Sequence, residues 1–202
     1  MKDINATVIV DLEGSEEEML KRFKKDVRKG INYARRNGLV VEKLTEEELE
    51  DFYEVYLDTM KRGGIPPLPL QALKEKVNLV FVCKKDEKII AGLGIIFRKD
   101  GTPVVEILAS LREYQKFYPN NFLYFYSFNW ARSQGYKKFD LGGWQINARG
   151  NLKGINEFKE RWGKVIYFKK DYPFIKAIGR KLIRTSSFFW WINKKIKKSI
   201  YK

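Results

Sequence analysis

The sequence contains no histidine among its 202 residues and only one cysteine, Cys83. The absence of histidine removes the most common general base, every Ser-His-Asp triad and every histidine metal ligand. A single cysteine excludes a disulfide framework and a cysteine zinc site, and it fits a reducing compartment. Any chemistry must therefore use Asp, Glu, Lys, Tyr, the backbone or the substrate itself.

Long apolar runs are also missing. No stretch reaches about 18 uncharged apolar residues, the length that a membrane-spanning helix needs. The opening segment MKDINATVIVDLEG has no basic region followed by an apolar run, so we expect no secretory signal. Hydrophobic residues still make up 44% of the chain and aromatic residues 15%, which is enough for a folded core. We expect a cytoplasmic protein.

Positive charge is abundant. The chain carries 40 Lys and Arg against 25 Asp and Glu, a net charge of +15. Such a surface attracts polyanions, namely nucleic acid, anionic lipid or phosphorylated substrates. The alternative is a lysine-rich surface of the kind found in thermophiles, without a polyanionic partner.

Hydrophobic periodicity predicts the order of the elements. The first half reads as a strand, a long helix that Ser15 and Glu18 cap and Gly38 ends, a strand, and a helix that Thr45 and Glu48 cap. The second half reads as a hairpin meander, an apolar helix that Asn120 or Asn121 caps, a strand, a short helix and a strand. The expected segments are 7–12, 16–37, 40–44, 46–62, 70–77, 78–85, 88–99, 102–111, 121–134, 136–143, 154–163 and 164–170. This order predicts a mixed α/β fold with one central, largely antiparallel sheet and helices on both faces.

The outer face of the first long helix is strongly basic, with Lys25, Arg28, Lys29, Arg35 and Arg36 as candidates for binding nucleic acid or another anion. Two interpretations stay open. The face is either a solvated helix surface or a surface that follows a phosphate chain.

From residue 172 to residue 202 the chain has no acidic residue. We treat residues 1–171 as the main domain and residues 172–202 as a basic, amphipathic helical extension. Trp190, Trp191, Lys194 and Lys195 combine aromatic and basic side chains, as interfacial membrane helices do. The alternative is a C-terminal helix that packs these aromatic side chains on the core.

Several stretches resemble a known family. The run FDLGG at residues 139–143 is followed by G-x-x-x-F-K-x-x-W-G at residues 154–163, and IAGLGIIF and ARSQGYKKFDLGG precede it in order. Together with KKDVRKGINYARRNGLVVEKL, these stretches resemble the C-terminal half of FemAB-type aminoacyltransferases, over roughly residues 7–169. The resemblance implies a GNAT-like acyltransferase fold and a role in building the peptidoglycan of the cell wall.

The resemblance also implies an activity and a set of residues. Similar proteins transfer an amino acid from aminoacyl-tRNA to an amine of a peptidoglycan precursor. Phe158 and Lys159 match the Phe-Lys pair of the family, and Asp140, Gly142 and Gly143 match its strand-end turn. We expect Lys159 to supply positive charge to the tRNA end or to the oxyanion, and Phe158 to stack on a base or to wall the site.

The remaining candidates have two interpretations each. Asp140 either accepts a proton from the incoming amine or caps the turn that follows it. Arg161 and Trp144 either contact substrate or serve the structure, Arg161 by pairing with acids and Trp144 in the core. Glu106 and Glu113 are weaker candidates for the base.

Two departures from the family pattern shape the functional hypothesis. The chain matches only the second of the two GNAT-like halves, so a homodimer or a partner chain would have to supply the first. The connection LREYQKFYPNNFL at residues 111–123 lacks the glycine-rich turn with which an ordinary GNAT enzyme holds coenzyme A.

We therefore expect an aminoacyltransferase with no bound cofactor and no metal, which uses aminoacyl-tRNA as co-substrate and acts on an anionic cell-envelope precursor, at the inner membrane face or in the cytoplasm. The alternatives are an N-acyltransferase that uses acyl-CoA to modify an amino sugar or surface precursor, and a non-catalytic half-domain that binds tRNA, a membrane or a protein partner.

Overall fold

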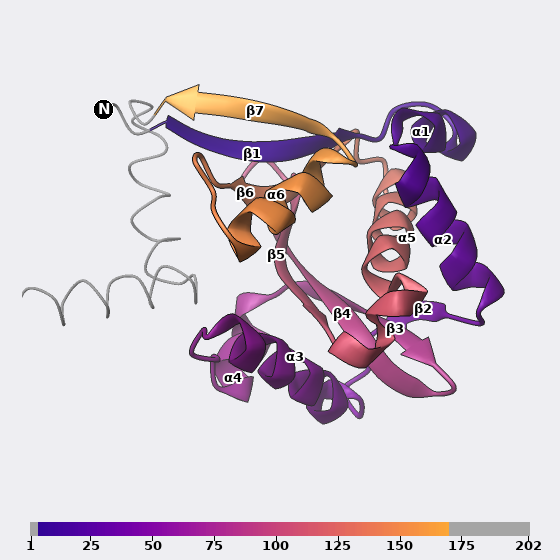
Figure 1. Cartoon of the computed structure of the whole chain (residues 1–202), viewed down its shortest axis with the longest axis vertical. Coiled ribbons are helices and arrows are strands. Elements are labelled where there is room, and N and C mark those ends of the chain that lie inside the picture. The colour runs from indigo at the N-terminus through magenta and orange to yellow at the C-terminus, as the bar shows by residue number, and fades with distance from the viewer. Residues whose placement is uncertain (1–3, 170–202) are drawn as a thin grey trace, which may run out of the picture.

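The computed structural model describes residues 4–169, which form one seven-stranded sheet with helices on both faces (Figure 1). Its strands are β1 (Ile4–Asp11), β2 (Val40–Lys43), β3 (Leu79–Lys85), β4 (Lys88–Phe97), β5 (Pro103–Ser110), β6 (Lys138–Trp144) and β7 (Lys164–Lys169). Its helices are α1 (Glu16–Arg22), α2 (Lys25–Arg36), α3 (Leu49–Gly63), α4 (Leu70–Lys76), the 3₁₀ helix η1 (Arg112–Phe117), α5 (Pro119–Ser133) and α6 (Asn151–Glu160).

The strand order is β2-β3-β4-β5-β6-β1-β7. All neighbouring strands run antiparallel except β5 and β6, which run parallel. Among the described residues these two strands pair only at Val104 and Asp140. The sheet is therefore mixed and largely antiparallel, as the sequence predicts. The pairing of β5 with β6 is the shortest between any two neighbouring strands described.

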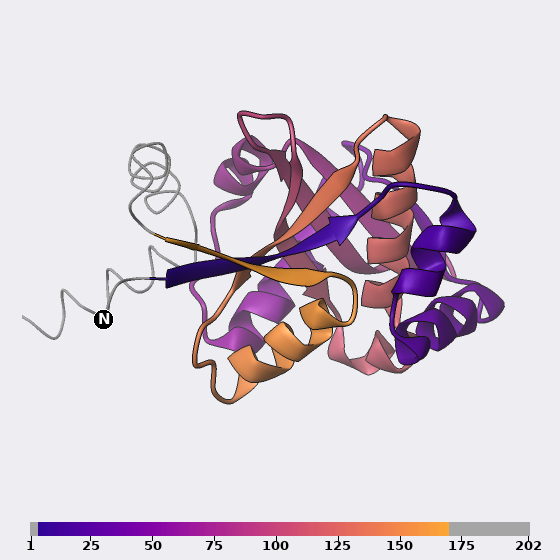
Figure 2. The ribbon, with the colours of Figure 1, turned by 90° about the horizontal axis from the view of Figure 1, so that it is seen from above.

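Two hydrophobic clusters hold the helices to the sheet. One contains the buried side chains of α1, α2 and α5 together with inward-facing residues of most strands. The other contains those of α3 and α4 on the opposite face. Seen from above, the bundle of α1, α2 and α5 lies to one side of the sheet and α6 lies beside β6 (Figure 2). Side chains on almost every side of α5 are buried, as its apolar composition predicts.

The first predicted helix is wrong in one respect, because two helices replace it. The capping box of Ser15 and Glu18 is present at the start of α1. Phe23 and Lys24 then adopt extended backbone, so that Phe23 turns inward, where it is 3% exposed and packs against Trp162 at 5.0 Å between ring centroids. The N–H of Lys24 bonds to the carbonyl of Arg161 instead of continuing the helix.

Two other predicted caps are also wrong. The helix expected after Thr45 begins only at Leu49, with Glu48 as its N-cap; the Glu48 carboxylate accepts the Thr45 N–H, as in the predicted capping box, and pairs with Lys84 at 2.5 Å. Helix α5 begins at Pro119, with Tyr118 as its N-cap and no side-chain cap. Proline suits the first helical position, because the N–H that it lacks would have no partner there.

The boundary expected at residue 171 and the C-terminal extension, including Trp190, Trp191, Lys194 and Lys195, lie outside the described residues. Within residues 4–169, no helix combines the length and the apolar character needed to cross a bilayer.

Candidate active site

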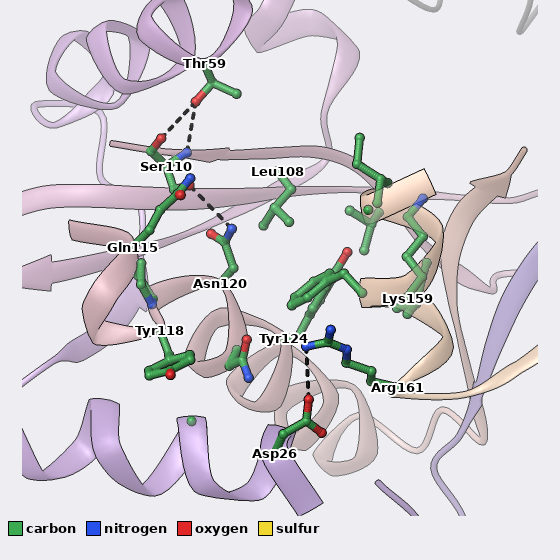
Figure 3. Close-up of a pocket in the computed structure, with 18 of the residues that line it drawn as sticks. Asp26, Thr59, Leu108, Ser110, Gln115, Tyr118, Asn120, Tyr124, Lys159 and Arg161 are labelled. Carbon is green, nitrogen blue, oxygen red and sulfur yellow. Dashed lines mark hydrogen bonds and ion pairs between the residues drawn. The ribbon is translucent and has the colours of Figure 1, made fainter. Parts of the chain in front are cut away.

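A cavity of about 1740 Å³ opens where β5 and β6 separate. Its walls come from α2, η1, the start of α5, the C-terminal part of β5 and α6 (Figure 3). Glu106, Leu108 and Ser110 of β5 line it in the region where this strand no longer pairs with β6. A parting of parallel strands thus creates the space, as in other sheets that bind ligands between diverging strands.

The cavity is strongly electropositive. Seven basic residues line it against two acidic ones, Asp26 and Glu106. The basic residues are Lys29, Arg35, Arg36, Arg62, Arg112, Lys159 and Arg161. A concave site with such an excess of one charge concentrates anionic ligands.

Three contacts fix α6 on the end of β6. The Lys159 Nζ atom donates to the Gly143 carbonyl at 2.9 Å. The Trp144 indole N–H donates to Glu160 at 2.6 Å. The Asn156 amide both accepts from the Gln145 N–H at 3.0 Å and donates to its carbonyl at 2.7 Å. The start of the polar loop is therefore held against the C-terminal half of α6.

Gly142 has a backbone φ of +75°, and a Cβ atom there would lie 2.9 Å from the Val105 carbonyl oxygen. Glycine is needed at this position both for the left-handed backbone and for the close approach of β5. Gly143 has neither requirement, since its nearest neighbour would lie 3.9 Å from an added Cβ.

Asp140 is fully buried behind this turn. One carboxylate oxygen accepts hydrogen bonds from the Thr7 hydroxyl and, at 2.7 Å, from the Gly142 N–H. The other oxygen forms an ion pair with Arg98, whose side chain is 43% exposed. Asp140 therefore has the contacts of a turn cap, which is the structural interpretation that the sequence left open.

Lys159 is half-buried on the cavity wall, and Figure 3 places it across the cavity from Tyr118. Burial lowers the pKa of its ammonium group from 10.5 to about 8, although the negative charge of Asp140 opposes this shift. A lysine of this kind is a stronger proton donor than an ordinary surface lysine and carries its charge in a region of limited hydration.

Phe158 and Arg161 also line the cavity. The Phe158 ring stacks on Tyr124 at 5.4 Å between centroids, so one of its faces is already occupied by α5. Arg161 pairs with Asp26 of α2 at 3.0 Å, and this salt bridge joins α6 to α2 below the cavity (Figure 3).

Comparisons with known proteins show which family and which solved structures this chain resembles. A model of the FemAB family matches residues 1–67, about a third of the chain. The solved structure of FemX superimposes with a TM-score of 0.69 at 16% identity, over 86% of this chain and 63% of FemX. The first third of the chain thus matches the FemAB family model, and the chain shares its GNAT-like fold with FemX. It spans less than two thirds of the length of FemX.

Two further solved structures share the fold of this chain. The C-terminal domain of a protein described as a lysylphosphatidylglycerol synthetase, from Agrobacterium fabrum, has a TM-score of 0.58 at 17% identity, over 81% of this chain and 57% of that one. A protein described as a GNAT-family acetyltransferase, from Novosphingobium aromaticivorans, has a TM-score of 0.50 at 11% identity, over 83% and 61%. No curated protein matches the sequence.

The basic residues predicted on α2 divide into two groups. Lys29, Arg35 and Arg36 line the cavity. Lys25 does not, and Arg28 donates to the carbonyls of Leu20 and Lys21, where it closes the end of α1. Trp144 also lies outside the cavity lining, because its ring packs against Tyr167 at 5.8 Å.

One of the two weaker candidates for the base lies in the site, and further residues enter it without having been predicted. Glu106 lines the cavity and pairs with Lys76 at 2.5 Å, whereas Glu113 is not part of the lining. Arg62 of α3 reaches the rim, where it donates to the Ser110 carbonyl. Arg112 and Tyr118 flank η1. Only the three-residue spacing of Arg112, Gln115 and Tyr118 could have indicated this in the sequence, since it suits a 3₁₀ helix.

Within residues 4–169, Cys, Asp and Glu side chains form no cluster that could hold a metal ion. Cys83 is buried, and burial raises the pKa of its thiol to about 12, which fits a packing role.

Proposed function

We propose that this FemAB-type domain is a transferase that moves an aminoacyl group from aminoacyl-tRNA to an amine of a cell-envelope component. The match to the FemAB family and the fold shared with FemX support this assignment. The fold shared with a protein described as a lysylphosphatidylglycerol synthetase supports a cell-envelope acceptor.

The observation that carries the proposal is Lys159, a half-buried cation with a pKa lowered to about 8 that faces a large, electropositive cavity. In aminoacyl transfer the nitrogen of the acceptor amine attacks the ester carbonyl carbon, and negative charge develops on the carbonyl oxygen. A fixed ammonium group next to that oxygen can lower the barrier by about 3–4 kcal/mol. Lys159 needs no histidine to do this.

Proton transfer completes the reaction. The tetrahedral intermediate expels the ribose oxygen, the new C–N bond remains, and the proton lost by the amine neutralises the leaving alkoxide. Glu106, a cavity carboxylate on β5, is our candidate for relaying this proton. Asp140 instead positions the Gly142–Gly143 turn on which Lys159 rests. Positioning of both substrates supplies the rest of the rate enhancement.

The partner, the acceptor and the location belong to the same proposal. The anionic precursor or lipid headgroup would enter the electropositive cavity, at the inner membrane face. A second copy of the chain or a partner chain would supply a first GNAT-like half. Membrane contact through Trp190, Trp191, Lys194 and Lys195 stays a prediction from the sequence alone.

A transfer assay with labelled donors tests the proposal. Purified protein receives aminoacyl-tRNA labelled in the amino acid in one reaction and labelled acetyl-CoA in another, each with a cell-envelope precursor extract. Label that moves from tRNA into the extract is the expected result. Label that moves only from acetyl-CoA would replace the tRNA donor by acyl-CoA, and transfer from neither donor, with a partner extract added, would favour a non-catalytic binding half.

A further inference from the structure

Tyr124 of α5 is a buried side chain whose polar end borders the cavity. The residue is only 1% exposed, yet it belongs to the cavity lining. Figure 3 shows its ring between Leu108 and Arg161, with the hydroxyl oxygen on the side that faces Lys159. Tyr124 therefore offers a single phenol hydroxyl to a molecule in the cavity.

The Tyr124 hydroxyl has no hydrogen-bond partner in the part of the chain that the structure describes. Other buried hydroxyls there are paired. Tyr56, which is also 1% exposed, accepts the Leu68 N–H at 3.0 Å, and the fully buried Ser127 donates to the Leu123 carbonyl at 2.8 Å. A buried hydroxyl without a partner destabilises a fold, so most buried tyrosines find one. The unpaired hydroxyl at the cavity wall is thus suited to a ligand.

Three aromatic side chains hold the Tyr124 ring in place. The ring stacks on Phe128 at 5.7 Å and on Phe158 at 5.4 Å between centroids, and the edge of Trp162 meets it at 5.4 Å. The hydroxyl therefore has a fixed position before a substrate enters. Donors that are fixed in advance stabilise a developing charge better than donors that must first reorient.

The hydroxyl borders the same region of the cavity as the Lys159 ammonium group. Phe158, which stacks on Tyr124, directly precedes Lys159 in α6, and all three residues line the cavity. Burial raises the pKa of the Tyr124 phenol, so it keeps its proton over the pH range in which Lys159 loses its own. The cavity thus contains one charged and one neutral donor, from two different helices.

We propose that Tyr124 is a second catalytic residue, whose hydroxyl donates a hydrogen bond to the carbonyl oxygen of the acyl group as that oxygen becomes negative. When the amine nitrogen attacks the carbonyl carbon, an electron pair of the C=O bond moves to the oxygen, and it returns when the leaving group departs. Tyr124 keeps its proton throughout, and Lys159 contributes the charge. The proposal rests on the proposed function only in requiring acyl transfer, because the carbonyl oxygen of an aminoacyl ester and that of a thioester develop the same charge.

Tyr124→Phe tests the assignment, because it removes one oxygen atom and keeps the ring. Transfer to the precursor extract is measured with the full chain and with both labelled donors. We expect kcat to fall about 10²-fold, because the lost hydrogen bond forms only in the transition state, and KM to change by less than about twofold. The melting temperature should stay equal or rise, since the hydroxyl that is removed was unpaired. Tyr126→Phe is the matched control, because Tyr126 lies on the same helix, is 38% exposed and does not line the cavity.

A double variant tests whether both donors act on one oxygen. Lys159→Met combined with Tyr124→Phe should lose less activity than the product of the two single losses, because groups that act as a unit are not additive. Losses that multiply would place the hydroxyl on a different atom and overturn the shared-oxygen assignment.

The remaining outcomes separate this inference from the proposed function. A Tyr124→Phe protein as fast as the wild type would overturn the role of Tyr124 and leave the transferase intact. A raised KM with an unchanged kcat, or a lost rate together with a lowered melting temperature, would make Tyr124 a binding or a structural residue and also overturn this role. A wild-type protein that transfers from neither donor would refute the proposed function, and this inference with it.

Discussion

The ammonium nitrogen of Lys159 lies 2.9 Å from the carbonyl oxygen of Gly143. This one hydrogen bond links the only cation of α6 that has a lowered pKa to a turn that Asp140 holds from behind. The orientation of the ammonium group therefore depends on Thr7, Arg98 and Asp140, none of which lines the cavity. A site built in this way resists small displacements, as precise charge stabilisation requires.

Lys159→Ala is expected to lower the rate of transfer about 10²–10³-fold, because it removes the cation next to the developing oxyanion. Lys159→Arg should restore part of the rate. Lys153→Ala is the control on the same helix, since Lys153 is 69% exposed and pairs only with Glu157. Single-turnover rates from labelled donor measure the effect, and a Lys159→Ala protein as fast as the wild type would remove this residue from the mechanism.

The pH dependence of transfer follows from the same group. Lys159 must be protonated to act as a cation, and its pKa is about 8, so the rate should fall as the pH rises through about 8. Lys159→Arg should keep its remaining activity to higher pH, because arginine stays charged. The measurement is a pH–rate profile of the wild-type protein and of Lys159→Arg. If the rates of the two proteins fell over the same alkaline pH range, Lys159 would not be the group that titrates.

The lowered pKa of Lys159 should also make the stability of the protein depend on pH. Between pH 8 and pH 10.5 the unfolded chain binds more protons at Lys159 than the folded chain does, so this group makes the protein more stable as the pH rises. Below that window the buried charge is unfavourable. Lys159→Met should therefore raise the melting temperature at pH 7, and this advantage should shrink toward pH 10.5. Lys153→Met, which changes an exposed lysine, should show no such trend.

Gly142→Ala and Gly143→Ala form a matched pair of variants. Alanine at residue 142 meets both a φ of +75° and the Val105 carbonyl, so a loss of about 1–3 kcal/mol in the free energy of unfolding is expected. Alanine at residue 143 has open space and should change stability little. Urea unfolding of both proteins compares them, and equal losses would show that the turn is not constrained as described.

Arg98→Ala should cost about 1–3 kcal/mol of unfolding free energy, because it leaves the fully buried Asp140 carboxylate without its counter-charge. Lys99→Ala, one residue further on and exposed, should stay within about 0.5 kcal/mol. Urea denaturation again provides the measurement. No difference between the two variants would mean that water or another group solvates Asp140.

Local patterns predicted most of the fold. Hairpin signals and apolar spacing located the meander of β3, β4 and β5 and the buried helix α5 almost to the residue. The break between α1 and α2 could not be predicted, because it depends on a contact of Lys24 with Arg161, 137 positions later in the sequence.

Long-range contacts also decided the candidate site. The FDLGG and Phe-Lys motifs predict Lys159, Phe158 and Asp140 as candidate site residues. The partners that define the role of Asp140 are Thr7 on β1 and Arg98, which directly follows β4. The motif does not predict which way Trp144 points. Its ring contacts Tyr167 and Glu160 and does not line the cavity.

The single pairing of Val104 with Asp140 has a consequence for how the molecule avoids unwanted association. Where β5 and β6 part, the described sheet has two inner edges in addition to its outer ones at β2 and β7. Open strand edges invite pairing with other chains. Here the inner edges border a cavity whose walls carry an excess of positive charge, which disfavours strand pairing there with a second copy of this basic chain.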